Sequence, residues 1–227
     1  MKSAVITFPG SNCDRDMDVA LKKFGFKNKM VWHQDVELPK SDLVVLPGGF
    51  SYGDYLRCGS MASKSKIMQS VINFANSGGM VMGICNGFQI LVETGLVPGV
   101  LLRNKYLEFI CKNVFVKINN KNSDYFKNIN NEVLELHIAH NEGNYFCTND
   151  QLKEIEDHNQ VAINYCNIDG KIEEKFNPNG SLKNIAGIFN KEKNVLGMMP
   201  HPERMIDPSL SGNDGSLFFK NLINNLK

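Results

Sequence analysis

One short stretch constrains this chain more than any other. Residues 80–84 have the composition of a buried strand, and the apolar residues 88–92 can begin a helix. Cys85 lies between them, with a glycine two positions away on each side. A sharp strand-to-helix bend crowds the backbone and excludes large side chains at those two positions. The stretch therefore predicts a nucleophile elbow, with cysteine in place of the more common serine.

The predicted position of Cys85 has a chemical consequence. At a helix N-terminus, free N–H groups and the helix dipole favour a thiolate over a thiol. Most free cysteines are instead small buried apolar residues, and the local sequence fits that role equally well. No two of the six cysteines form a C-x-x-C pair, so no metal site is expected. Nothing in the sequence indicates secretion, and we expect reduced thiols in a cytoplasmic chain.

The composition argues against several classes of function. The chain has 227 residues, enough for one large core, and we expect a single domain over residues 1–227. A net charge of +1 offers no basic surface for nucleic acid or for a membrane. No apolar run approaches the length of a transmembrane helix, and the N-terminus does not have the anatomy of a signal peptide.

The first hundred residues alternate between strand and helix patterns. The expected strands are residues 3–8, 29–32, 42–46 and 80–84, and the expected helices are residues 14–24 and 60–76, followed by the helix after Cys85. This rhythm predicts an α/β fold with a doubly wound, mostly parallel, flavodoxin-like sheet. Ligands of such sheets bind beyond the carboxyl ends of the strands, where Cys85 and the Gly-rich residues 47–49 are expected to lie.

The second half of the chain has a different rhythm. Residues 114–118, 133–138 and 161–165 are expected to be strands, with no convincing helix between them. Residues 185–189 and 195–199 are expected to form a hairpin, and residues 214–227 a closing amphipathic helix. We therefore expect added antiparallel strands that extend the same domain.

A cysteine nucleophile needs a base, and His201 is the strongest of five histidines for that role. It follows a predicted buried strand, lies between two prolines that stiffen the backbone, and has Glu203 two residues later to orient it. Beside it, the N–H groups of Gly49 and Asn86 can form an oxyanion hole. These groups suit acyl transfer through a thioester, but they do not identify the carbonyl substrate.

Longer blocks of the sequence resemble a known enzyme family. Residues 83–89 resemble the nucleophile motif of class I, or triad, glutamine amidotransferases, and residues 200–203 resemble the His-Pro-Glu signature of that class. The blocks similar to the glutaminase subunits of phosphoribosylformylglycinamidine synthase are residues 8–14, 48–57, 177–181 and 195–204. Because these blocks span nearly the whole chain, it is identified as a member of that family.

The resemblance implies roles for particular residues. Cys85 would be the nucleophile, His201 the general acid and base, and Glu203 the partner that orients His201. The N–H groups of Gly49 and Asn86 would stabilise the oxyanion. The residues implied to bind glutamine are Gly48, Phe50 and Gln89.

The family also implies a multisubunit enzyme of purine biosynthesis. This subunit would hydrolyse glutamine, and an ATP-dependent synthetase subunit would use the ammonia to convert formylglycinamide ribonucleotide to formylglycinamidine ribonucleotide. No Walker-type G-x-x-x-x-G-K-[ST] motif is present, so we expect no cofactor in this chain, and ATP and magnesium on the synthetase. A large synthetase subunit and a small accessory subunit are the expected partners. Residues 51–58 are expected to contact them through Tyr52, Tyr55 and Arg57.

Two positions depart from the family pattern, and other functions remain open. Cys58 replaces an expected alanine, and residues 140–143 read His-Asn-Glu-Gly where His-Gly-Glu-Gly is expected. A role of His140 and Glu142 in the site or at the subunit interface, and a place in a surface turn, fit the sequence equally well. The alternatives are another class I amidotransferase subunit, a cysteine hydrolase of similar fold, and a non-catalytic scaffold. Cysteine hydrolases of this kind commonly have a histidine directly after the nucleophile, where this chain has Asn86.

Overall fold

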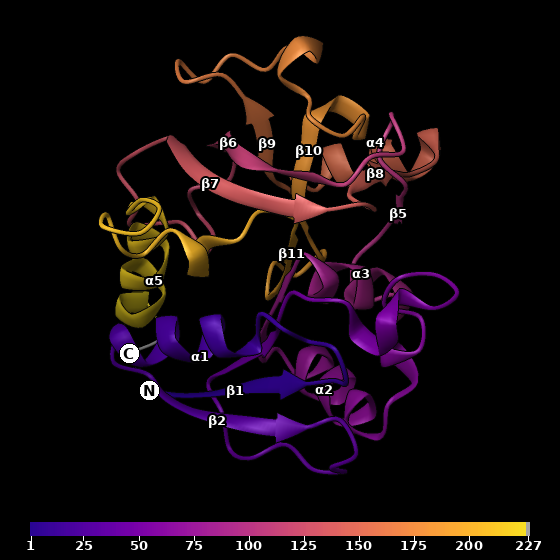
Figure 1. Ribbon diagram of the computed structural model, residues 1–227, viewed down its shortest axis with the longest axis vertical. Coiled ribbons are helices and arrows are strands. Elements are labelled where there is room, and N and C mark those ends of the chain that lie inside the picture. The colour runs from indigo at the N-terminus through magenta and orange to yellow at the C-terminus, as the bar shows by residue number, and fades with distance from the viewer. Residues whose placement is uncertain (226–227) are drawn as a thin grey trace.

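The protein is built on one mixed sheet of nine strands, seen in a computed structural model that describes residues 1–225 (Figure 1). The strand order is β2-β1-β3-β4-β11-β10-β9-β6-β7. The parallel strands are β1 (Lys2–Thr7), β2 (Lys27–Trp32), β3 (Leu43–Leu46), β4 (Met80–Ile84) and β11 (Val195–Met198). The antiparallel strands are β6 (Ile110–Ile118), β7 (Val133–His140), β9 (Val161–Cys166) and β10 (Ile185–Phe189). The predicted α/β class, with a parallel first half and antiparallel additions, is confirmed.

The centre of the sheet carries the most apolar sequence. Every residue of β3, β4 and β11 is buried, as expected for parallel strands covered on both faces. The helices of the first half are α1 (Asp14–Lys23), α2 (Lys66–Asn76) and α3 (Asn86–Glu93). Of these, α3 packs against β3, β4 and β11 together. Strand β4, which leads to Cys85, therefore lies in the middle of the core. This packing holds the carboxyl end of the strand rigidly.

The predicted helix over residues 60–76 is wrong in its first turns. Residues Ala62–Lys64 form a separate 3₁₀ turn, and α2 begins only at Lys66. Ser65 between them has an extended backbone, with a ψ of 150°, so the two segments cannot be one helix. Apolar spacing continues across this break, which is why the sequence pattern does not show it.

The expectation of no helix among the later strands is also wrong. The helix α4 (Asn149–Asp157) lies between β8 (Asn144–Phe146) and β9. Only one of its residues, Ile155, is buried, so it has almost no apolar stripe to detect. Its sequence signal is instead a capping box, in which Thr148 and Gln151 each bond the backbone of the other. A two-stranded sheet of β5 (Val100–Leu102) and β8 was likewise not expected.

The predictions for the end of the chain are confirmed as far as the structure describes it. Strands β10 and β11 form the expected antiparallel hairpin. The helix α5 (Asp214–Asn225) is the expected closing helix, and positions 226–227 of that prediction lie outside the described residues. No helix among residues 1–225 is long and apolar enough to cross a lipid bilayer.

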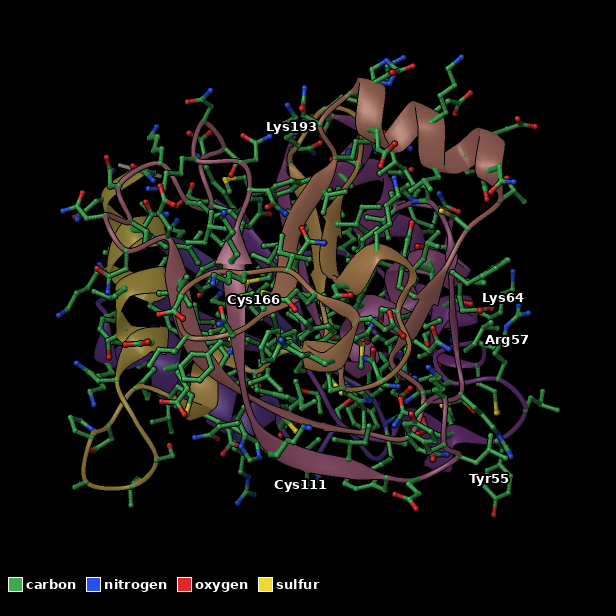
Figure 2. The ribbon with its side chains drawn as sticks, turned by 90° about the horizontal axis from the view of Figure 1, so that it is seen from above. Tyr55, Arg57, Lys64, Cys111, Cys166 and Lys193 are labelled. Carbon is green, nitrogen blue, oxygen red and sulfur yellow. The ribbon has the colours of Figure 1, made fainter. Side chains whose placement is uncertain are left out.

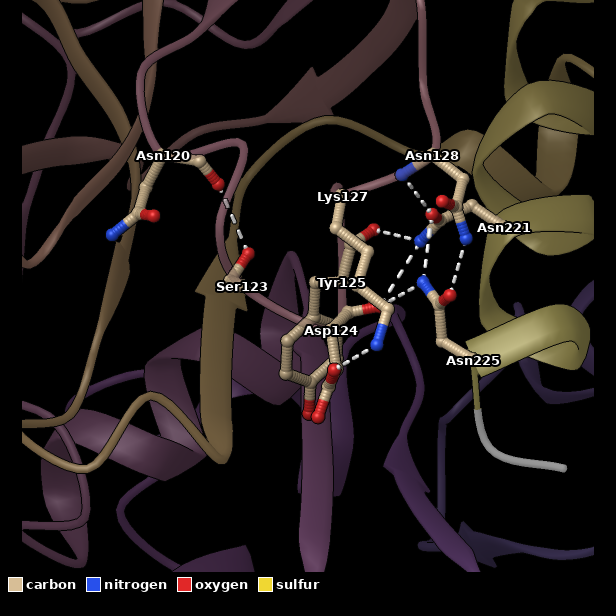
Figure 3. A network of polar contacts seen from close by, with 8 residues as sticks. All are labelled: Asn120, Ser123, Asp124, Tyr125, Lys127, Asn128, Asn221 and Asn225. Atoms are coloured by element: carbon tan, nitrogen blue, oxygen red, sulfur yellow. Dashed lines mark hydrogen bonds and ion pairs between the residues drawn. The ribbon is translucent and has the colours of Figure 1, made fainter.

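The long connection between β6 and β7 is fixed by buried hydrogen bonds (Figure 3). The Asn221 side chain, on α5, donates to the carbonyl of Tyr125 at 2.6 Å and accepts from the N–H of Asn128 at 2.8 Å. The hydroxyl of Tyr125 donates to the carbonyl of Val81, on β4, at 2.8 Å. Because these polar groups are satisfied internally, the connection ties α5 to the central elbow strand.

Candidate active site

Cys85 stands at a strained bend between β4 and α3. Its φ of 51° and ψ of −106° are rare for a residue with a side chain, and such strain is concentrated at functional sites. Its N–H donates to the carbonyl of Met198, on β11, at 2.8 Å, and its carbonyl accepts from the N–H of Gln89 at 3.1 Å. The predicted elbow is confirmed, and both neighbouring elements hold Cys85 in this conformation.

The two glycines of the motif are required by close backbone contacts. A Cβ on Gly83 would lie 2.6 Å from the carbonyl oxygen of Gly87. A Cβ on Gly87 would lie 1.9 Å from the carbonyl oxygen of Leu46, at the end of β3. Without side chains at both positions, α3 can approach the sheet closely enough to present Cys85 at its edge.

We expect Gly87→Ala to lower the free energy of unfolding by about 3 kcal/mol or more, because backbone must move to admit the methyl group. Urea denaturation measures the loss. The matched control is Gly25→Ala, where φ is +92° and no atom lies within 4 Å of the added Cβ. That control should cost only the about 1–2 kcal/mol of a left-handed backbone. Equal losses in the two variants would contradict the close contact between α3 and β3.

His201 and Glu203 lie at the same edge of the sheet as Cys85. Strands β4 and β11 are parallel neighbours in which Ile84 pairs with Met198, so the segments that follow both strands emerge together. The N–H of His201 donates to the carbonyl of His137 at 2.8 Å, which fixes the backbone of the histidine to β7. The structure therefore brings the nucleophile and base predicted from the sequence to one place.

The electrostatics of His201 favour a charged imidazole. Its Nδ1 lies 2.6 Å from Oε1 of Glu203, and both side chains are almost fully buried. Burial opposes a charge, but the carboxylate of Glu203 and the sulfur of Cys85 outweigh it and raise the pKa of His201 to about 10. At neutral pH the imidazole thus carries a positive charge near the sulfur of Cys85. Its Nε2 has no partner within residues 1–225 and is free to exchange a proton.

A cavity of about 150 Å³ opens onto Cys85. It is lined by Gly49, Phe50, Asp54, Leu56, Cys58, Cys85, Gln89, Arg103, Ala139, His140, Asn141 and Glu142. Three residues that the resemblance assigns to oxyanion or glutamine binding, Gly49, Phe50 and Gln89, are among them. Gly48 is not among them and lies against the imidazole of His201: a Cβ on Gly48 would be 2.6 Å from Cε1 of His201.

Asn86 and Gln89 form part of one hydrogen-bonded wall. The amide nitrogen of Asn86 donates to Oε1 of Gln89 at 2.9 Å, and its oxygen accepts from the N–H of Ser51 at 3.2 Å. Nε2 of Gln89 donates to the carbonyl of Glu142 at 2.7 Å. The backbone N–H of Asn86 belongs to the first turn of α3, where helical N–H groups have no intrahelical acceptor.

The site also contains residues that the sequence did not single out for chemistry. Asp54, Arg103 and Asn141 line the cavity, and only Asp54 lies in one of the family-like blocks. His140 and Glu142, which fitted either a site or a surface turn, also lie in the cavity wall. No local pattern marks Arg103, whereas Asn141 is the residue that departs from the family pattern in residues 140–143.

The side chains of residues 51–58, predicted to contact a partner, differ in their exposure. Tyr52 is only partly exposed, and its hydroxyl lies 2.7 Å from Nδ1 of His33. Tyr55 is 74% exposed and Arg57 bonds Glu93 from the surface, and Figure 2 shows both at the periphery of the molecule. Positive φ angles at Tyr52, Asp54 and Leu56 give this segment an unusual, strained course along the cavity.

The cysteines differ in their surroundings. All six are unpaired, and only Cys111 is exposed. Burial raises the pKa of Cys13 to about 12 and that of Cys166 to about 11, and it raises the pKa of Cys58 and Cys147 as well. Four buried thiols are therefore held in the neutral, unreactive form. Residues 1–225 contain no cluster of three or more His, Cys, Asp or Glu side chains suited to a metal ion.

Comparison with known proteins agrees with this geometry. Residues 1–213 match the family described as the CobB/CobQ-like glutamine amidotransferase domain. The phosphoribosylformylglycinamidine synthase subunit PurQ of Pelagibacter ubique is 80% identical over 227 residues, which cover both chains completely. The chain belongs to the PurQ family. The PurQ subunit of Gloeobacter violaceus is 50% identical, with 98% of this chain and 97% of that protein covered.

Solved structures extend the comparison to the fold. A chain in the PurLQS structure from Thermotoga maritima is 39% identical, with a TM-score of 0.87 and coverage of 100% of this chain and 99% of that one. A glutamine amidotransferase from the same organism is 16% identical with a TM-score of 0.64, which shows a shared fold alone. The family resemblance stated from the sequence blocks is thereby confirmed.

Proposed function

We propose that this PurQ family member hydrolyses glutamine at Cys85 and supplies the ammonia to a synthetase that makes formylglycinamidine ribonucleotide. The observation that carries the proposal is the meeting of the Cys85 elbow with the buried His201–Glu203 pair in a cavity lined by family-like blocks. The family fixes the kind of reaction, phosphoribosylformylglycinamidine synthesis with glutamine as the nitrogen donor.

The proposed chemistry follows the positions of these groups. The sulfur of Cys85 attacks the carboxamide carbon, and the resulting oxyanion accepts from the N–H groups of Gly49 and Asn86. Nε2 of His201 gives its proton to the departing amine, which leaves as ammonia, and a thioester remains. Water then attacks the thioester carbon and gives a proton to His201, the C–S bond breaks, and glutamate leaves as the thiolate of Cys85 and the charged imidazole are restored. Glu203 holds the imidazole orientation and stabilises its charged form.

The partners follow from the relatives. The name PurLQS of the Thermotoga maritima structure joins the subunit to PurL and PurS, and we infer the same two partners here. ATP and magnesium belong to the synthetase partner, and the assembly is cytoplasmic. Tyr55 and Leu56 are exposed beside the cavity, and aromatic and apolar side chains of this kind are suited to a protein interface. Docking at this segment is the proposed means of activating the site.

The test uses the assembled synthase and a glutamine-analogue electrophile. Glutamine should drive amidine synthesis with ATP, and the isolated chain should turn over glutamine much more slowly than the complex. The electrophile should modify Cys85 before the four buried thiols. Because Cys111 is exposed, labelling is done in the Cys111→Ser variant, so that accessibility alone cannot mimic activation.

The same experiment separates the alternatives. A peptidase-like hydrolase would cleave peptides in preference to releasing glutamate from glutamine. A scaffold that only activates the synthetase would show equal labelling of the remaining cysteines and no glutamine-driven synthesis. Either result would overturn the proposal.

A further inference from the structure

The cavity at Cys85 is lined by hydrogen-bond acceptors away from the triad. Asp54 and Glu142 come from segments far apart in the sequence, and both carboxylates act on the thiol of Cys58, whose pKa is raised first by burial and then by their charges. The two acids therefore lie near each other at one part of the wall. His140, on β7 two residues before Glu142, lines the same cavity.

The bonds of His140 define which of its nitrogens is the acceptor. Oδ1 of Asn104 accepts from the N–H of Gly143 at 3.1 Å, and its Nδ2 donates to the carbonyl of His140 at 2.9 Å, which fixes the amide orientation. Nδ1 of His140 lies 3.1 Å from that Oδ1 and so must carry the proton. Burial, followed by the charge of His201, lowers the pKa of His140 to about 3. The ring is therefore neutral, and its Nε2 is an acceptor.

That acceptor has no partner. His140 is 2% exposed, and its Nε2 bonds no atom of residues 1–225. A buried acceptor without a donor is costly, and a ligand that brings a donor removes the cost. The residue thus indicates a ligand with hydrogen-bond donors, independently of the two acids.

The charged side chains of the cavity wall also favour a ligand that carries donors and a positive charge. Asp54 forms no ion pair with the described residues, and burial, together with the charge of Glu142, raises the pKa of Asp54 to about 6. The one arginine of the wall, Arg103, is 68% exposed, and its Nε lies 3.7 Å from Oε1 of Glu142. A cation bound inside the cavity would relieve this excess of negative charge.

We propose that Asp54, Glu142 and Nε2 of His140 bind the α-ammonium group of the substrate amino acid. This inference rests on the proposed function, and it assigns the selection of an α-amino acid amide to these residues. An ammonium group has three donors and no acceptor, so it matches a wall of three acceptors. The cavity thereby distinguishes glutamine from amides that have the same chain length but lack the amine.

The test compares glutamine with its des-amino analogue, 4-carbamoylbutanoate, in the assembled synthase. The wild-type enzyme should favour glutamine in kcat/KM by at least about tenfold, as expected for a charged hydrogen-bonded group. In Asp54→Asn and in Glu142→Gln, the KM for glutamine should rise by about tenfold or more while kcat changes less than about threefold. For the analogue, kcat/KM should change by less than about threefold, because it has no ammonium to lose.

The control is Glu132→Gln, which removes an exposed carboxylate that pairs with Lys121 outside the cavity. This variant should leave kcat/KM for both substrates unchanged. In every variant, the rate of ammonia-driven synthesis reports whether the complex has assembled. Equal losses for glutamine and the analogue would overturn the inference. If a variant fails to assemble, the wild-type ratio decides, and equal use of both substrates would refute ammonium recognition. No glutamine turnover by the wild-type complex would instead refute the proposed function.

Discussion

Replacing Cys85 with serine is expected to reduce glutamine-driven synthesis by about 10⁴-fold or more. Serine keeps the shape of the elbow but is a far weaker nucleophile, and His201 is held as a cation that cannot readily take the serine proton. The measurement is formation of formylglycinamidine ribonucleotide by the reconstituted synthase at saturating glutamine.

Two comparisons make that loss specific to the nucleophile. Ammonia-driven synthesis should survive in Cys85→Ser, because the proposed function assigns the synthetase reaction to the partner subunit. Cys111→Ser should retain both activities, since Cys111 is exposed on β6 and is not among the residues that line the cavity. If Cys85→Ser kept a tenth of the glutamine-driven rate, another group would have to be the nucleophile.

Replacing Glu203 with glutamine is expected to lower kcat for glutamine by about 10²- to 10⁴-fold. The substitution keeps the size of the side chain but removes the charge 2.6 Å from Nδ1 of His201. The imidazole then loses the partner that orients it and that stabilises its positive form. Ammonia-driven synthesis should again be unchanged, whereas a rate close to wild type would exclude Glu203 from the triad.

The same variant should change the pH dependence of stability. The pKa of His201 is raised from 6.5 to about 10 in the folded protein, so its charge stabilises the fold fully below pH 6.5. That contribution disappears as the pH rises through about 10. Relative to wild type, Glu203→Gln should therefore be most destabilised near pH 6 and least near pH 10, measured by urea denaturation. A constant difference across this range would contradict the raised pKa.

The sequence predicted those parts of the structure that local patterns determine. The elbow follows from the spacing of Gly83, Cys85 and Gly87, because each glycine is required by a backbone contact. The place of His201 follows from topology, since parallel strands end at a common edge. The agreement of β3, β4 and β11 with their predicted ranges has the same origin: strands buried on both faces are continuous apolar runs.

The parts that were missed depend on contacts between distant residues. No sequence pattern indicated that the hydroxyl of Tyr52 bonds His33, which lies nineteen positions away in sequence. The acceptor role of His140 depends on Asn104, thirty-six positions away. Helix α4 was missed for another reason. Ile155 is its one buried residue, so its sequence signal is the capping box and not an apolar stripe. Such features depend on contacts between residues distant in sequence or on polar helix caps. The periodicity of apolar residues does not reveal either.

The insertion of β11 between β4 and β10 has a consequence for biosynthesis on the ribosome. The strand that completes the centre of the sheet, and the histidine that follows it, are made more than one hundred residues after Cys85. Until residues 195–203 emerge, β4 has an open edge and the thiol has no imidazole beside it. A growing chain therefore lacks the pairing of Cys85 with His201 until residues 195–203 have been translated and β11 has joined β4.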